Sequence, residues 1–411
     1  MNEQEQVNKT ECLKESLAKK VFLQYINSTD FNGLPLENVK SCIEANIINL
    51  VSDLIEEDKV CILTSNMESN PHINRFGFLS KEEQLNAIRS IASDETVVLY
   101  PSNSYLRTHI DDTQFQLFPF KRMMAFGQPQ LCACYFEYDV LQHYVFNPQI
   151  EFKFSDYYGS IHSSENSDSR RCINLKTFGI GRNEDKLIIV SYPRYLHNMS
   201  SMNQLIWQGY MIEADDKCKV LKDYQENEFY NSWDFPQTIY RAILQEISNI
   251  CELSTEAFGV SFFTKTYKKE ELPNYDILPF PSSETYYQFL LLMEKIIVSN
   301  INPKFFENSI CTKDETGKQL GTLACLKLWL THVNDNVCEE ICDPLKELRH
   351  ERQTPAHKIY NNVYTYDFLT KQHELCKSIY NSLHLLRCLL QTHPKAEDFV
   401  LKYPNTNYYE V

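Results

Sequence analysis

Glycine is scarce in this sequence, with only 10 glycines among 411 residues. Loops that wrap the phosphates of a nucleotide need glycines at fixed spacing, and the sequence contains neither G-x-x-x-x-G-K-[S/T] nor G-x-G-x-x-G. The low glycine content also argues against collagen-like and low-complexity chains. We therefore expect neither a P-loop NTPase nor a Rossmann-type dinucleotide enzyme.

Long apolar stretches are missing as well. The longest runs, such as Phe289 to Met293, are far shorter than the ~20 apolar residues that cross a membrane. The opening residues MNEQEQVNKTE are polar and do not resemble a signal peptide. We therefore expect a cytoplasmic protein without membrane association, whose 14 cysteines are reduced thiols. No second Cys or His pair follows Cys132 and Cys134 at zinc spacing, so we expect neither a metal nor a cofactor.

The chain also lacks an excess of positive charge, because its formal net charge is −15. A protein that binds nucleic acid over a broad surface is usually basic, since neutralised phosphates supply most of the non-specific affinity. Cations are nevertheless concentrated in one segment, LKELRHERQTPAHKIY, which runs from Leu345 to Tyr360. Its basic and imidazole side chains are Lys346, Arg349, His350, Arg352, His357 and Lys358. This segment could hold a few phosphates in one local site.

Arg352 and His357 suggest the chemistry of this segment. Residues 344–352 are predicted to be helical, with Arg349 and Arg352 three residues apart on one face. Pro355 is expected to end that helix, which places His357 just past a bend and near Arg352. An imidazole can transfer a proton near neutral pH, and a guanidinium can hold two phosphate oxygens. The two groups together suit phosphoryl chemistry without a metal.

The segment from about Glu284 to Pro394 resembles a HEPN domain, a helical module of many prokaryotic ribonucleases, toxins and antiviral effectors. The phrase RHERQTPAHKI is similar to the Arg-x4-6-His motif of that superfamily, which occurs where two helices of a bundle meet. HEPN ribonucleases are typically metal-independent homodimers in which two copies of the motif face each other. The resemblance therefore implies a helical bundle, a homodimer and cleavage of RNA.

The same resemblance implies roles for individual residues. Arg352 and His357 would be the catalytic pair. The substrate-binding residues would be Arg349, His350, Gln353 and Lys358. Gln353 stands at the polar position after the arginine, where the superfamily more often has Asn, Asp or His. The implied partners are RNA (a single strand or a tRNA loop), a second copy of the chain, and a phage or host protein that triggers activity.

Periodicity predicts an α+β chain with four regions. These are a mainly helical region 1–95, a mixed α/β domain 96–268, a Pro-rich linker 269–283 and a HEPN-like helical domain 284–411. Helices are expected over 284–300, 320–333, 338–352 and 368–392. Ser80 and Glu83 have the spacing of a capping box that begins another helix. The stretch GVSFFTKTY, before the linker, is predicted to be a strand.

Aromatic residues are frequent in the mixed domain. They form either a ligand-binding face or simply part of the core, and the candidates are Tyr135, Phe136, Tyr157, Tyr158 and Phe178.

Two functions stay open at this point. The first is a metal-independent endoribonuclease that acts as a toxin or antiphage defence effector. The second is a non-catalytic HEPN-like module that dimerises or binds a nucleotide or protein. An Arg/His pair at such a spacing also arises by chance, and the chain has a second one, Arg387 and His393. We interpret that second pair as a cap at the C-terminus of the last helix.

Overall fold

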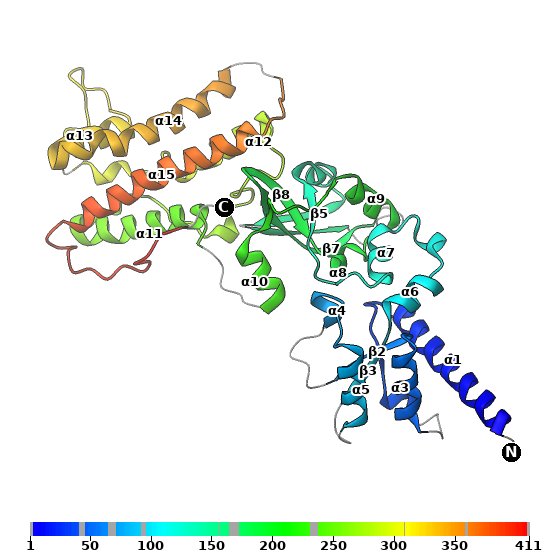
Figure 1. Cartoon of the computed structure of the whole chain (residues 1–411). Helices are drawn as coiled ribbons and strands as arrows, with labels where there is room; N and C mark the ends of the chain where they lie inside the picture. Colours follow the sequence, from blue (N-terminus) through cyan, green and yellow to red (C-terminus); the bar gives the residue numbers. More distant parts are fainter. Residues whose placement is uncertain are drawn as a thin grey trace. The chain divides into compact units, whose positions relative to one another are not determined.

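The computed structural model describes residues 3–40, 46–64, 71–91, 96–155, 157–163, 172–230, 237–307, 309–357 and 361–408. It confirms the α+β class, because helices and antiparallel sheets are both present (Figure 1). The chain divides into two compact units. The first contains Met1–Lys153 and Tyr158–Phe229, and the second contains Phe154–Tyr157 and Tyr230–Val411.

The N-terminal part of the first unit is a small sheet covered by helices. Its strands, in the order β1-β3-β2, are β1 (Leu34–Pro35), β3 (Val97–Pro101) and β2 (Val60–Thr64). The helices are α1 (Glu3–Asn27), α2 (Glu37–Lys40), α3 (Ile47–Glu56), α4 (Pro71–Asn74) and α5 (Lys81–Arg89). The predicted capping box is confirmed, since Ser80 Oγ accepts from the Glu83 amide and the Glu83 carboxylate accepts from the Ser80 amide.

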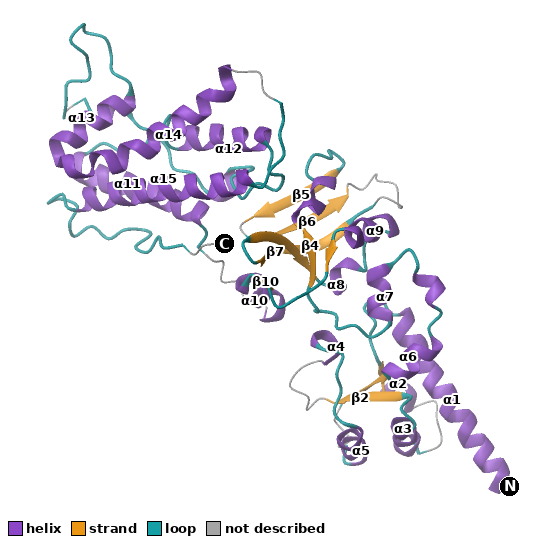
Figure 2. Cartoon of the chain, turned by 45° about the horizontal axis from the view of Figure 1, so that its top comes forward, coloured by secondary structure: helices purple, strands orange, loops and turns teal. Residues whose placement is uncertain are grey.

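The rest of the first unit is built on a seven-stranded sheet, shown in orange in Figure 2. Its order is β5-β6-β7-β8-β4-β9, and β10 pairs with β7. The strands are β4 (Cys134–Glu137), β5 (Ile150–Ser155), β6 (Tyr158–Ser163), β7 (Asn174–Asn183), β8 (Lys186–Ser191), β9 (Met211–Ile212) and β10 (Cys218–Val220). Helix α6 (Asn103–His109) still packs on the core of the small sheet through Tyr105. The helices that accompany the large sheet are α7 (Pro119–Ala125), α8 (Pro193–Leu196), α9 (Ser201–Gly209) and α10 (Lys222–Tyr230). Phe136 and Trp207 meet edge to face in its core, with ring centroids 4.8 Å apart.

The second unit is helical. Its long helices are α11 (Ile239–Phe258), α12 (Ser283–Ile296), α13 (Thr322–Asn334), α14 (Cys338–His357) and α15 (Asp367–Gln391). The last four confirm the predicted helices of the C-terminal region. One hydrophobic core joins all five, and helix α11 contributes Ile243, Ile247, Ile250 and Leu253 to it. Helix α11 lies along α15 in both views (Figures 1 and 2).

The predicted linker 269–283 is not a boundary between units. Tyr275 and Leu278 are buried in the core of the helical unit. The side chain of Gln372 on α15 binds this stretch, with Nε2 2.7 Å from the Asp276 carbonyl and Oε1 3.0 Å from the Leu278 amide. The division between the units falls instead between Phe229 and Tyr230. Proline content suggested a linker, but the Tyr275 ring contacts Tyr240 on α11 and Phe289 on α12, and Gln372 on α15 binds the backbone of this stretch.

The stretch GVSFFTKTY also differs from its prediction. It forms a single bridge, Phe263 to Ile301, rather than a strand. Phe262 and Phe263 are buried against the helices, so their apolar character reflects packing in the helical core and not a sheet. In the described part of the chain, no helix is both long enough and apolar enough to cross a membrane.

We predict that α11 is required for the helical unit to fold. A fragment 237–411 should unfold cooperatively, whereas a fragment 283–411 should not. Burial of four aliphatic side chains of α11 contributes about 1.5–3 kcal/mol each to the free energy of unfolding. Their sum is comparable with the ~5–15 kcal/mol free energy of unfolding of a whole domain. Thermal unfolding followed by circular dichroism distinguishes the two fragments. A cooperative transition in 283–411 at the same temperature as in 237–411 would contradict this assignment.

Candidate functional site

Helix α14, which carries the basic segment, is held firmly by its apolar face. Ile341, Leu345 and Leu348 recur at helical spacing and are buried in the core of the helical unit. Ser382 of α15 donates a hydrogen bond from its hydroxyl to the Ile341 carbonyl, 2.8 Å away. These contacts fix the rotation of α14 about its axis, and therefore fix which of its polar residues lie at the surface.

Arg349 forms an ion pair within the unit. Its Nε lies 3.8 Å from Oε1 of Glu294 on α12, a carboxylate whose side chain is only 6 % exposed. The hydroxyl of Ser299 lies 3.0 and 2.9 Å from the two oxygens of the same carboxylate. A buried carboxylate is costly unless it is paired, so Arg349 has a structural task at this position. Its predicted role in binding RNA remains a prediction.

Arg352, one turn further along α14, has a different environment. Its side chain is half-buried, and it makes no ion pair or hydrogen bond with any described residue. The neighbouring Glu351 accepts a hydrogen bond from the Tyr286 hydroxyl at 2.8 Å, and burial together with this carboxylate raises the pKa of Tyr286. Gln353 and His350 are exposed. Within the part of the unit that the structure describes, no carboxylate neutralises the guanidinium of Arg352.

The prediction that Pro355 ends the helix was wrong. Helix α14 continues through Pro355 to His357. Pro355 lacks the backbone N–H that would bind the carbonyl four residues earlier, and the helix ends only two residues later, at His357. Positions five apart on a regular helix are separated by about 140° around the axis and about 7.5 Å along it. A continuous α14 therefore does not bring positions 352 and 357 to one face.

Two of the predicted site residues fall outside this description. Lys358 lies beyond the described residues. The described part of the structure includes the backbone of His357 as the end of α14 but not its side chain.

The second Arg/His pair does not form the predicted cap. Nε of Arg387 lies 3.0 Å from Oε2 of Glu246 on α11, whose side chain is fully buried. The N–H does not point at that oxygen, so this contact is a charge pair and not a hydrogen bond. His384 Nδ1 and Thr406 Oγ1 lie 2.7 and 2.6 Å from Oε1 of Glu246. The network joins α11, α15 and the C-terminal segment, while His393 packs its ring on Phe258.

An aromatic pocket in the first unit was only partly anticipated. Tyr135 lines it, whereas Phe136, Tyr157 and Phe178 belong to the buried core. Tyr192, Gln225 and Phe229 also line this pocket and were not among the predicted residues. The aromatic residues of the α10 sequence KDYQENEFY were the available signal. Among the described residues, no group of three or more His, Cys, Asp or Glu side chains is arranged to hold a metal.

We predict that Arg387→Ala destabilises the helical unit by about 3–5 kcal/mol, because it leaves Glu246 buried without its cation. Lys346→Ala is the matched control, since it removes a cation from an exposed ion pair with Asp343 in the same unit. The control should cost less than about 1 kcal/mol. Urea unfolding of fragment 237–411 measures both changes, and equal losses would show that the Glu246 pair contributes no more than a surface pair.

Comparison with family models, curated protein sequences and solved structures finds no match to this chain. Helix α14 offers a guanidinium that no described carboxylate neutralises, and the first unit offers a pocket lined by aromatic rings.

Proposed function

We propose that the helical unit is a HEPN-like module that cleaves RNA without a metal, and that it acts as a cytoplasmic toxin or antiphage effector. The observation that supports this most is the contrast between two arginines on one rigid helix. Arg349 is paired with Glu294, whereas Arg352 has no partner among the described residues. An arginine without a partner among the described residues suits a phosphate ligand. The first unit would then select the substrate or sense a phage or host trigger.

The chemistry would be a transesterification within the RNA. His357 would take the proton from a 2′-hydroxyl, whose oxygen then attacks the adjacent phosphorus. Arg352 would stabilise the negative charge that builds up on the phosphorane oxygens. The bond to the 5′-oxygen breaks, that oxygen receives a proton, and the upstream fragment ends in a 2′,3′-cyclic phosphate. Exposed Gln353 and His350, together with Lys358, would contact neighbouring parts of the strand.

The course of α14 favours a site shared by two chains. Because positions 352 and 357 lie on different sides of one continuous helix, a second copy is the simplest way to bring an arginine and a histidine together. Apolar surface lies close by in sequence, where Val363, Tyr364 and Tyr366 are 53, 37 and 41 % exposed. The backbone of this segment is anchored by the Ser283 amide, which donates to the Val363 carbonyl at 2.9 Å. A fixed apolar surface of this kind suits a two-fold contact.

A non-catalytic role is the second candidate. The net charge of −15 disfavours broad contact with RNA, and the pairing of Arg349 with Glu294 reduces the local positive charge. In that case Arg352 would hold a single anion or an acidic segment of a partner protein. The unit would dimerise or bind without cleaving.

We predict that Arg352→Ala and His357→Ala each reduce RNA cleavage at least about 100-fold, the usual effect of removing a charge-stabilising donor or a general base. The double variant should be no worse than either single one, because the two groups act together. Lys346→Ala removes a cation from the same helix and should leave the rate unchanged. Cleavage of a fluorescent single-stranded RNA measures all four, and full activity in His357→Ala would favour the non-catalytic role.

Mixing the two inactive variants tests whether the site is shared. If Arg352 of one chain works with His357 of the other, a mixed dimer contains one intact site and one doubly altered site. Equal mixing should then restore about a quarter of the parent activity, since half of the dimers are mixed and half of their sites are intact. Mass photometry would report the dimer. If the mixture stays inactive although mixed dimers form, the shared site is wrong.

A further inference from the structure

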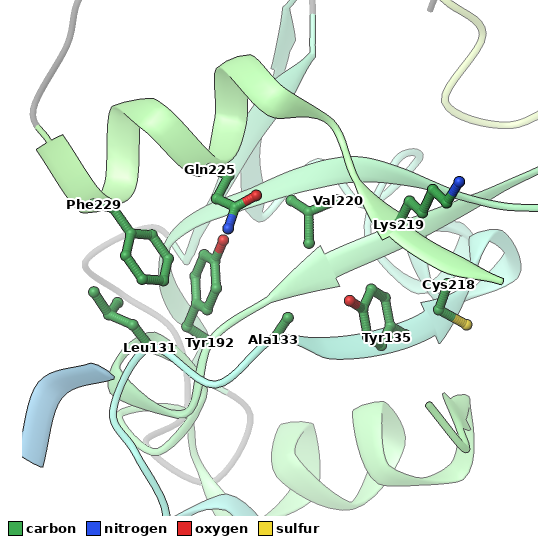
Figure 3. A pocket seen from close by; sticks show the side chains of 9 residues that line it. All are labelled: Leu131, Ala133, Tyr135, Tyr192, Cys218, Lys219, Val220, Gln225 and Phe229. Atoms are coloured by element: carbon green, nitrogen blue, oxygen red, sulfur yellow. The ribbon is translucent and has the colours of Figure 1, made fainter. Parts of the chain in front are cut away.

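The first unit contains a pocket of about 440 Å³ between helix α10 and the seven-stranded sheet (Figure 3). Its size falls in the range of about 300–1,000 Å³ that is usual for small-molecule sites. The lining residues come from the segment before β4, from β4 itself, from the end of β8, from β10 and from α10. They are Leu131, Ala133, Tyr135, Tyr192, Cys218, Lys219, Val220, Gln225 and Phe229.

Two glycines of β7 allow helix α10 and strand β10 to approach β7 closely. A Cβ atom at Gly179 would lie 2.2 Å from the ring of Tyr224 on α10, and one at Gly181 would lie 2.6 Å from the Lys219 carbonyl. Tyr224 is fully buried and stacks on Tyr192, with ring centroids 5.7 Å apart. The Tyr192 ring is thus held in a fixed position at the wall of the pocket, and Phe229 meets its edge at 6.1 Å.

The hydroxyl of Tyr192 is buried, yet it has no hydrogen-bond partner among the described residues. Leaving such a group without a partner costs about 1–3 kcal/mol. Burial raises the pKa of Tyr192, so the group stays a neutral O–H donor. Figure 3 shows this hydroxyl directed toward the side chain of Gln225, which is exposed and can move aside.

The chemistry of the walls limits the ligand. Tyr135, Tyr192 and Phe229 offer ring surfaces, and the Gln225 amide offers one donor group and one acceptor. Lys219 is the single charged residue among the lining residues, and Figure 3 shows its amine directed away from Tyr192. A neutral, flat ring with hydrogen-bonding groups along one edge matches these walls better than an anion or an aliphatic chain.

We propose that this pocket binds a nucleobase. The base would lie against the rings of Tyr135 and Phe229, accept a hydrogen bond from the Tyr192 hydroxyl, and pair its edge with the Gln225 amide. Stacking on aromatic side chains contributes about 1–3 kcal/mol per base and tolerates any base, so the hydrogen bonds would provide selectivity. This site is separate from Arg352 and His357 and does not depend on cleavage.

Isothermal titration calorimetry on the full chain tests this proposal, with adenosine, guanosine, cytidine and uridine as probes. At least one nucleoside should bind. The substitution Tyr192→Phe should lower the affinity for that nucleoside about 5–10-fold, the effect of losing one neutral hydrogen bond. Gln225→Ala, at an exposed position where folding should not suffer, should also weaken binding. Tyr275→Phe is the matched control, because it removes an equally unpartnered hydroxyl from the core of the other unit and should change nothing.

A second titration with short single-stranded oligoribonucleotides separates two sources of the base. Tighter binding of the nucleoside would identify a free ligand, and tighter binding of the oligonucleotide would identify a base within an RNA strand. Either result supports a nucleobase pocket. The proposal is overturned if none of these probes binds at millimolar concentration, or if Tyr192→Phe binds as well as the parent does.

Discussion

One buried carboxylate, that of Glu246, sets the arrangement on which the helical unit depends. It lies fully buried on α11 and is matched by Arg387 and His384 of α15 and by Thr406 of the C-terminal segment. A buried charge tolerates few alternative packings, because any shift that removes its partners leaves it uncompensated. This carboxylate therefore fixes α11 and the C-terminal segment against α15, while the surrounding aliphatic residues supply most of the stabilisation.

The position of α15 in turn determines which polar side chains of α14 lie at the surface. The bond from Ser382 to the Ile341 carbonyl and the burial of Leu345 and Leu348 set the rotation of α14. That rotation pairs Arg349 with Glu294 and leaves Arg352 half-buried without a described partner. The proposed RNA site thus follows from a chain of packing contacts that begins far from it. The same reasoning explains why the site would need a second copy, since one continuous helix separates positions 352 and 357.

Features set by neighbouring residues were predictable from the sequence, and those set by distant contacts were not. The capping box at Ser80 and the helices α12 to α15 follow from local spacing, and both are present. The amphipathic pattern of α11 was recognisable, but a pattern shows that a face is buried and not what covers it. Residues 239–258 were therefore placed in the mixed domain 96–268, and the stretch 269–283 was predicted to be a linker, whereas both belong to the helical unit.

In the candidate sites, too, features set by neighbouring residues were predictable and features set by distant contacts were not. Arg352 became a candidate because its motif is contiguous in sequence. The end of α14 was mispredicted because Pro355 was expected to stop the helix, whereas α14 continues two residues past it. Arg387 was interpreted as a cap because Glu246 lies far away along the chain. The pocket around Tyr192 brings together α10 and strands that no local pattern relates.

The central claim, metal-independent cleavage of RNA by the helical unit, is tested most directly by the chemistry of the RNA ends. Purified full-length protein is incubated with a defined single-stranded RNA in excess EDTA, and the products are weighed by mass spectrometry. We expect upstream fragments that are lighter by one water than a linear 3′-phosphate, the mass of a 2′,3′-cyclic phosphate. Intact RNA, or fragments that end in a 3′-hydroxyl, would contradict it.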